Sequence, residues 1–153
     1  MLDPLDSVEV LSYILKRAQE TGIKMTYVKA QKLLYCCYGV VLAKFGVRLC
    51  VESPRAWQYG PVFPRAFGAH HKKRLKSSAL FIEGPSFPAS IKSAIDETID
   101  FFGKYSATVL SKWTHREGSP WFIASNAGKD LHGPIGDVLI KSYFAENVVD
   151  ADA

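Results

Sequence analysis

The feature that most constrains the fold is a long apolar segment between Thr26 and Gly46. Its apolar side chains fall on most sides of a helix with about 3.6 residues per turn, and Thr26 and Gly46 are typical N-terminal and C-terminal capping residues. Residues 33–43 are mostly apolar, which is only about half of the ~20 residues needed to cross a bilayer. We therefore expect a central, buried helix around which the other elements pack.

Amphipathic segments precede and follow this central helix. Residues 8–18 repeat apolar side chains at helical spacing, with Asp6 or Ser7 as the N-cap and Gly22 as the stop. Residues 91–102 form an equally regular pattern that ends at Gly103. Further helices are expected after Pro61 or Pro64, from Ser106 through Trp113, in a short turn after Gly118-Ser119-Pro120, and from Pro134 through Phe144.

Residues 47–59 have a different character. They contain β-branched and aromatic residues and a proline, and they are too few for another helix, so we expect a short strand pair here, ended by a break at Gly60-Pro61. Residues 81–88 are rich in Gly and Pro and predict a loop. The predicted fold is mainly α, with about six helices and a small β element between the second and third; α+β is the alternative.

Composition bounds the class of protein. With 153 residues, 48% of them hydrophobic and 22% charged, the chain predicts a single domain over residues 1–153. The first residues are acidic and lack the apolar stretch of a secretory signal, so we expect a cytoplasmic protein with no membrane partner. The cysteines Cys36, Cys37 and Cys50 have no spacing typical of zinc or redox sites, and we expect them to be buried apolar side chains.

The combination of Thr114, His115 and Glu117 invites a catalytic interpretation, because a carboxylate can orient an imidazole as a general base. A nucleophile motif is missing, as are a Gly-rich phosphate loop and a His-Glu-x-x-His pattern. We therefore predict no catalytic residue, no cofactor and no metal. His115 and Glu117 are instead expected to bridge a helix end to the turn that carries Trp121.

Three separated blocks carry a family resemblance. They read Lys-Ala-Gln-Lys-Leu-Leu-Tyr at 29–35, Ala-Trp-Gln-Tyr-Gly-Pro-Val-Phe-Pro at 56–64, and Tyr-Ser-Ala at 105–107 followed by Thr-His-Arg-Glu at 114–117 and Pro-Trp at 120–121. In order and rough spacing the chain resembles the Panacea (SocA-like) domain family over about residues 8–144. The motif residues carried by this resemblance are Lys29, Gln31, Lys32, Leu33, Tyr35, Gly60, Tyr105, His115, Glu117 and Trp121.

The resemblance implies a function. Members of this family are known as antitoxins that bind and neutralise a toxin encoded beside them, with unrelated toxins for different members. At least one member also delivers its toxin to a Clp-type protease, and similar domains occur in phage-associated proteins. We therefore expect a cognate toxin as the partner, with a Clp-type protease as a further partner.

Two segments are candidates for partner contact. Trp57, Tyr59, Gly60 and Pro61, in a patch that runs from Trp57 to Pro64, could form an exposed aromatic ledge beside a rigid turn, or a corner of the core. Residues 70–76 carry four positive charges, equal to the net charge of +4, and fit a solvated helix end, a patch for an acidic partner, or a nucleic-acid contact. The alternative function is a phage-associated nucleic-acid-binding regulator. The predicted partner-binding residues are Trp57, Tyr59, Pro61, Phe63, Arg65, Lys72, Lys73 and Arg74.

Overall fold

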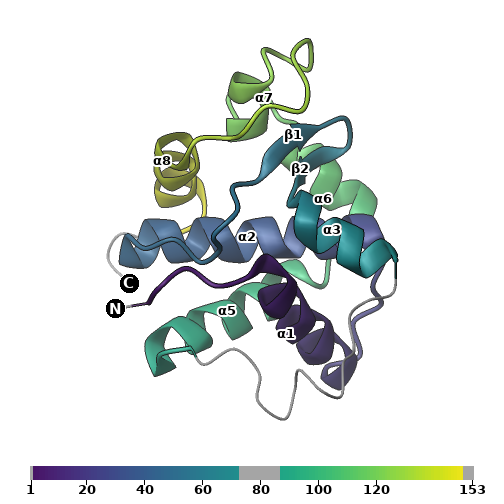
Figure 1. Cartoon of the computed structure of the whole chain (residues 1–153), viewed down its shortest axis with the longest axis vertical. Coiled ribbons are helices and arrows are strands. Elements are labelled where there is room, and N and C mark those ends of the chain that lie inside the picture. The colour runs from purple at the N-terminus through teal and green to yellow at the C-terminus, as the bar shows by residue number, and fades with distance from the viewer. Residues whose placement is uncertain (1, 73–86, 150–153) are drawn as a thin grey trace.

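The computed structural model describes residues 2–72 and 87–149, and these contain seven helices and one antiparallel strand pair (Figure 1). This confirms the predicted mainly helical fold with a small β element between the second and third helices. The elements are α1 (Ser7–Glu20), α2 (Tyr27–Phe45), β1 (Arg55–Trp57), β2 (Gly60–Val62), α3 (Pro64–His71), α5 (Ala89–Phe102), α6 (Ala107–Thr114), α7 (Pro120–Ala124) and α8 (Asp137–Asn147).

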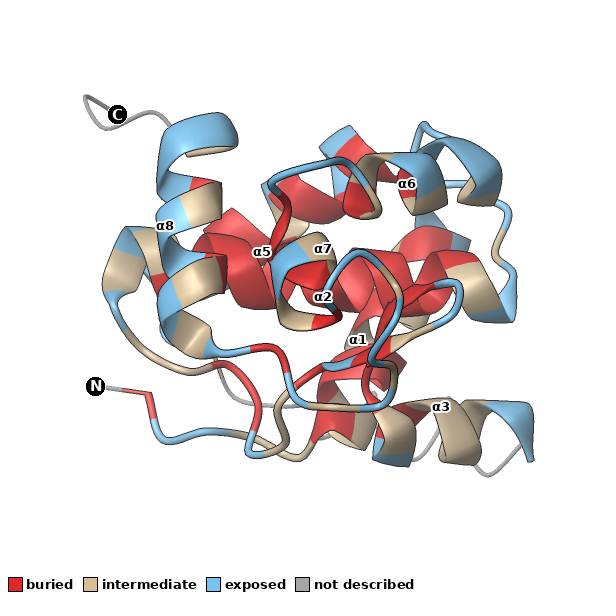
Figure 2. Ribbon diagram, turned by 90° about the horizontal axis from the view of Figure 1, so that it is seen from above, coloured by how far each residue is buried: buried red, intermediate tan, exposed pale blue. Residues whose placement is uncertain are grey.

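Helix α2 is the centre of the structure, as its apolar sequence predicted. Every residue from 29 to 42 is buried, and α2 contacts α1, α3, α5, α6, α8 and β2. Figure 2 shows α2 buried, with α3 and α6 on opposite sides of it in that view. The capping residues are as predicted: the Thr26 hydroxyl accepts a hydrogen bond from the Lys29 amide at 3.1 Å, and Gly46 is left-handed with φ of 69°.

The C-terminal half of α2 is packed against α8 through a close approach. Gly39 has no Cβ, and a Cβ built there would lie 2.4 Å from the Phe144 ring, so this position must remain open. The same ring meets Tyr35 edge-on, with centroids 5.3 Å apart. Phe144 therefore anchors α8 on the central helix.

The strand pair lies later in the chain than predicted. The strands are 55–57 and 60–62, so Gly60 and Pro61 belong to β2 and do not break the chain after the pair; we call residues 55–62 the hairpin. Pro61 lies opposite Ala56, whose own amide and carbonyl bond to Gly133 and His132. The missing N–H of Pro61 is therefore not needed by β1.

One further prediction is wrong, and two others lie largely outside the described residues. The last helix begins at Asp137 and not at Pro134, because Pro134 forms a bridge with Arg55 and the Ile135 amide donates to the Pro54 carbonyl at 2.8 Å. The third helix does start at Pro64, but the predicted loop 81–88 and the basic run beyond Lys72 lie largely outside the described residues. No helix in the described ranges combines the length and apolar character needed to span a membrane.

Candidate partner-binding site

The first half of α2 carries three buried polar side chains that hold neighbouring backbone. The Lys32 ammonium donates to the Pro61 carbonyl at 3.1 Å. The Gln31 side-chain oxygen accepts from the Phe63 amide at 2.8 Å. The Lys29 ammonium donates to the Gly103 carbonyl at 2.7 Å. Side chains of the first sequence block (29–35) thus hold the backbone of the second block (56–64), and Lys29 also holds the residue that ends α5.

The third sequence block reaches the same hairpin from the other side. The Trp121 indole N–H donates to the Trp57 carbonyl at 2.7 Å, and His115 Nε2 lies 2.8 Å from the Gln58 carbonyl oxygen. The rings of His115 and Trp121 lie against each other, with centroids 4.1 Å apart. Glu117, which was expected to share this bridge, is exposed and makes no side-chain hydrogen bond or ion pair with any described residue.

Lys32 lies in a tightly filled space under the hairpin. Its side chain is 1% exposed, and burial lowers the pKa of its ammonium to about 8, with a smaller opposing effect from the nearby Cys36. A Cβ at Gly60 would lie 2.7 Å from Lys32 Cε and 2.8 Å from the Thr114 hydroxyl, and Gly60 has φ of 114°. Glycine is therefore required at this position by both space and backbone conformation.

The tip of the hairpin projects into solvent. Tyr59 is 65% exposed, although the backbone on both sides of it is held by Trp121, His115 and Lys32. A groove of about 500 Å³ runs beside it, lined by Thr26, Val28, Tyr59, Ala107, Thr108, Ser111, Lys112 and His115. An exposed tyrosine on a fixed backbone offers contact area at a small loss of conformational entropy.

The other predicted partner-binding residues differ in exposure. Trp57 is half-buried, whereas Pro61 and Phe63 are buried. Arg65 is exposed and forms a 2.7 Å ion pair with Asp6, whose pKa is lowered chiefly by this hydrogen bond. Lys72 is exposed, and Lys73 and Arg74 lie outside the described residues.

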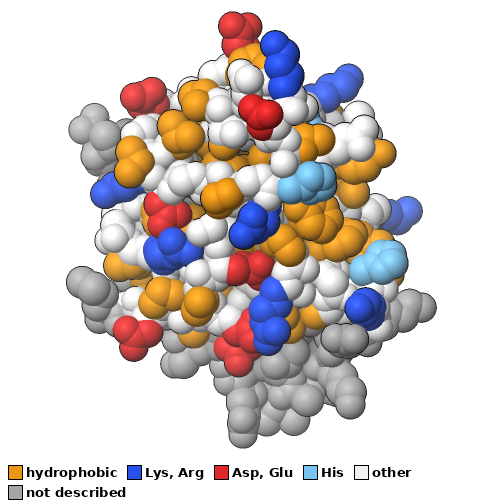
Figure 3. All heavy atoms as spheres, turned by 45° about the horizontal axis from the view of Figure 1, so that its top comes forward, with side chains coloured by type: hydrophobic (Ala, Val, Ile, Leu, Met, Phe, Trp, Pro, Cys, Tyr) orange, Lys and Arg blue, Asp and Glu red, His pale blue; other side chains and the backbone are white. Residues whose placement is uncertain are grey.

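The structure adds three residues that were not predicted, His132, Phe67 and His71, to the aromatic surface around Trp57. His132, Trp57, Phe67 and His71 form one continuous line of rings, which we call the aromatic row. Consecutive centroids are 6.1, 5.6 and 5.7 Å apart. Figure 3 shows a face of the molecule on which hydrophobic and histidine side chains lie next to one another, with Lys or Arg side chains around them. Because the rings come from β1, α3 and the segment before α8, no local sequence pattern could indicate the row.

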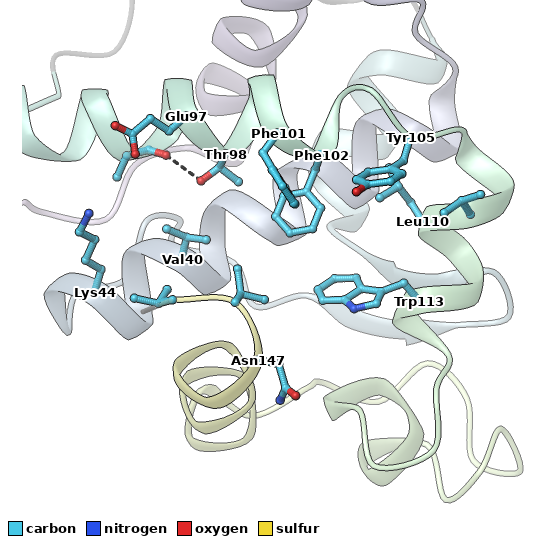
Figure 4. A pocket seen from close by; sticks show the side chains of 14 residues that line it. Val40, Lys44, Glu97, Thr98, Phe101, Phe102, Tyr105, Leu110, Trp113 and Asn147 are labelled. Atoms are coloured by element: carbon cyan, nitrogen blue, oxygen red, sulfur yellow. Dashed lines mark hydrogen bonds between the residues drawn. The ribbon is translucent and has the colours of Figure 1, made fainter. Parts of the chain in front are cut away.

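A second concave surface lies between α2, α5, α6 and the end of α8. This apolar cleft has a volume of about 510 Å³, and Phe101, Tyr105 and Val109 on its walls are 51%, 36% and 49% exposed. Figure 4 shows Lys44 and Glu97 at one end and Leu110 and Trp113 at the other. Tyr105, one of the motif residues, therefore belongs to the cleft and not to the hairpin.

The remaining motif residues, Leu33 and Tyr35, lie in the hydrophobic core. Leu33 is fully buried and Tyr35, which packs on Phe144, is 1% exposed; burial raises the pKa of the Tyr35 phenol well above its usual value. The three cysteines are buried as free thiols. Among the described residues, no three His, Cys, Asp or Glu side chains are grouped so as to hold a metal ion.

Comparison with known proteins gives two matches that include this site. The family described as "Antitoxin SocA-like, Panacea domain" matches residues 31–122, which begin at Gln31 in α2 and end in α7, the helix that carries Trp121. Antitoxin SocA of Caulobacter vibrioides (strain NA1000 / CB15N) is 29% identical over 155 residues, which cover 92% of this chain and 82% of that protein. No solved structure matches.

Proposed function

This chain belongs to the SocA-like Panacea domain family, and from that membership we propose that it is an antitoxin that neutralises a cognate toxin by direct protein–protein binding. The proposal includes action in the cytoplasm and a toxin encoded beside the gene. The observation that carries it is the similarity to Antitoxin SocA over nearly the whole chain, because a match of this extent includes the hairpin, its supporting side chains and the surrounding helices.

We assign the toxin contact to the face that carries the hairpin. In support, Tyr59 is exposed at the tip and Trp57 is half-buried beside it. Lys32, His115 and Trp121 hold the hairpin backbone, and Gln31 holds the Phe63 amide directly after it. Tyrosine and tryptophan on a rigid support are typical of binding hot spots. Neutralisation would then follow from occlusion of the toxin surface that this face covers.

The test is growth of a bacterial host that expresses the neighbouring gene, with and without this protein, followed by affinity purification of the complex. Rescue of growth together with a stoichiometric complex supports the proposal. A neighbouring gene product that is harmless, or toxic but neither rescued nor bound, rejects cognate neutralisation for this pair.

Point variants then test the assigned face. Tyr59→Ala should weaken the complex by about 2 kcal/mol or more, a change of roughly 30-fold in Kd. The matched control is Phe101→Ala, which truncates a side chain of comparable exposure (51% against 65%) in the apolar cleft. If Tyr59→Ala and Arg65→Ala both stay folded and neutralise normally, the hairpin face is not the toxin contact.

Delivery of the toxin to a Clp-type protease is a separate proposal that rests on the family resemblance. It predicts that the toxin is degraded faster when this protein is present and that deletion of the protease removes the difference. A toxin half-life that does not depend on this protein would leave occlusion as the whole mechanism.

The alternative function is a phage-associated regulator that binds nucleic acid. Its support is the basic run that begins at His70, of which the structure describes only residues 70–72. Salt separates the two functions: phosphate binding should weaken with a log–log slope of roughly −0.9 for each neutralised phosphate, and an interface with an aromatic centre should change much less.

A further inference from the structure

The aromatic row has a cation at each end. Arg55 donates from its guanidinium to the His132 carbonyl at 3.0 Å, which places it at one end, and Lys72 follows His71 directly at the other. Both side chains are on exposed residues, and neither forms an ion pair with any described residue. Two cations are therefore available to a partner along one line of rings.

The carboxylates beside α3 are already engaged. Asp6 binds the Arg65 guanidinium, with contacts of 3.0 and 2.7 Å. Glu52 accepts from the Ser7 hydroxyl and from the Arg65 amide at the start of α3. These two carboxylates are thus tied up within the protein and do not neutralise Arg55 or Lys72.

The geometry of the rings indicates which kind of anion fits. Trp57 packs edge-on against both His132 and Phe67, at interplanar angles of 64° and 69°. In each edge-on contact the edge of one ring covers part of the other ring's face, and the Phe67 and His71 rings stack on each other at 23°, so fewer ring faces are left for nucleic-acid bases to stack on. Their outward edges carry the positive part of the ring quadrupole, which favours carboxylates and edge contacts with apolar side chains.

We propose that the aromatic row docks an acidic segment of the protein partner, in which an apolar side chain lies on Trp57 and Phe67 and carboxylates meet Arg55 and Lys72. This rests on the proposed antitoxin function and adds to it the chemistry of the toxin surface that is recognised. The charge complementarity also predicts faster association at low ionic strength.

The experiment compares two double charge reversals for binding to the protein encoded by the neighbouring gene. Arg55→Glu with Lys72→Glu reverses the ends of the row, and Lys44→Glu with Lys104→Glu makes the same charge change beside the apolar cleft. We expect the first pair to weaken Kd at least tenfold at about 0.15 M salt and the second pair to leave it within about twofold. Melting curves confirm that both variants remain folded.

Rescue makes the test specific to the row. Photo-crosslinking from position 67 identifies the partner segment, and replacing its carboxylates by Lys should restore binding to the Arg55→Glu, Lys72→Glu protein. If that protein binds as tightly as wild type while Tyr59→Ala does not, the row is not the docking site but the antitoxin function stands. If wild type does not bind the neighbouring gene product, both proposals fail.

A nucleic-acid partner would give a different pattern. The probe is a fluorescein-labelled oligothymidylate of about 20 nucleotides, titrated with the wild-type protein and both double variants. We expect no binding that depends on Arg55 and Lys72. Binding of the oligonucleotide that the first pair abolishes, with unchanged binding of the protein partner, would overturn the proposal in favour of a nucleic-acid surface.

Discussion

The buried part of α2 has a polar half, residues 29–32, and an apolar half, residues 33–42, and the two act differently. Residues 29–32 include two lysines and a glutamine, and each of these donates to or accepts from the backbone of another element. Residues 33–42 are mostly apolar, and there Gly39 lets the Phe144 ring lie directly on the helix. The polar half thus fixes the position of the hairpin, and the apolar half packs into the hydrophobic core.

This difference teaches why a small domain places charged residues in its core. Burial of an ammonium opposes folding, as the lowered pKa of Lys32 shows, and a well-packed apolar residue is often more stabilising. A directional hydrogen bond, however, determines where the Pro61 carbonyl lies. We therefore expect variants of the apolar half to change mainly stability and variants of the polar half to change mainly the hairpin and its binding.

The largest effect should come from the apolar half. Phe144→Ala removes a fully buried ring from the contact with Gly39 and Tyr35, and the cavity should lower the free energy of unfolding by about 3–5 kcal/mol. Urea unfolding followed by circular dichroism measures this.

Gly39→Ala alone should also destabilise the protein, because the new Cβ meets the Phe144 ring. In the Phe144→Ala background it should stabilise instead, because the Cβ enters free space and alanine favours the helix. Equal effects of Gly39→Ala in both backgrounds would contradict the assigned contact.

The next largest effect is the pH dependence of stability that is expected from Lys32, in the polar half of α2. The pKa of Lys32 is about 8 in the folded protein against 10.5 for an unperturbed lysine, so between these values the unfolded state binds more protons. The stability of wild type relative to Lys32→Met should therefore rise from pH 8 to 10.5, by at most about 3 kcal/mol. The buried thiols of Cys36, Cys37 and Cys50 have raised pKa values and act in the opposite direction, but they are common to both proteins. Parallel stability curves for the two proteins over this range would contradict a buried, charged Lys32.

A smaller loss is expected for Gln31→Leu. The Phe63 amide would lose its acceptor in the core, which should cost about 2 kcal/mol. The control is Gln19→Leu on the exposed side of α1, which should change stability by less than about 0.5 kcal/mol. Amide hydrogen exchange sharpens the comparison: Gln31→Leu should speed exchange in residues 55–63 more than in α8. Uniformly faster exchange across both regions would show that Gln31 acts only through global stability.

The smallest effect is expected for Trp121→Phe, which deletes the hydrogen bond to the Trp57 carbonyl and should cost about 1 kcal/mol. Trp113→Phe is the matched control, because its indole N–H has no hydrogen-bond partner among the described residues. Toxin binding should weaken more for Trp121→Phe than for Trp113→Phe at equal stability. The reverse order would place the functional surface at the apolar cleft.

Local features of the fold were predictable from the sequence. The caps Thr26 and Ser106 and the stops Gly46 and Gly103 were predicted correctly, because a cap bonds to residues within one turn of itself. For the first helix the N-cap is Asp6, one of the two candidates, and the C-cap is Thr21, one residue before the predicted stop at Gly22. The position of the hairpin was wrong because strand pairing depends on residues 132–134, which are distant in sequence. The contact of His115 with Trp121 was predictable, but the contacts that hold the hairpin were not, because the supporting side chains bind backbone groups, which every residue has. The aromatic row and the apolar cleft are each built from several elements that are far apart in the sequence, so no local sequence pattern could predict them.

The way in which the hairpin is held has a consequence for how such a protein can change its specificity. The supporting contacts are made to the Trp57, Gln58 and Pro61 carbonyls and to the Phe63 amide directly after the hairpin, and all of these are main-chain groups. The supports therefore do not depend on which side chains occupy 58 and 59, whereas Gly60 has no room for a Cβ. Substitutions at the tip can accumulate without loosening the loop, so this scaffold can diverge toward new partners by mutation at its most exposed positions alone.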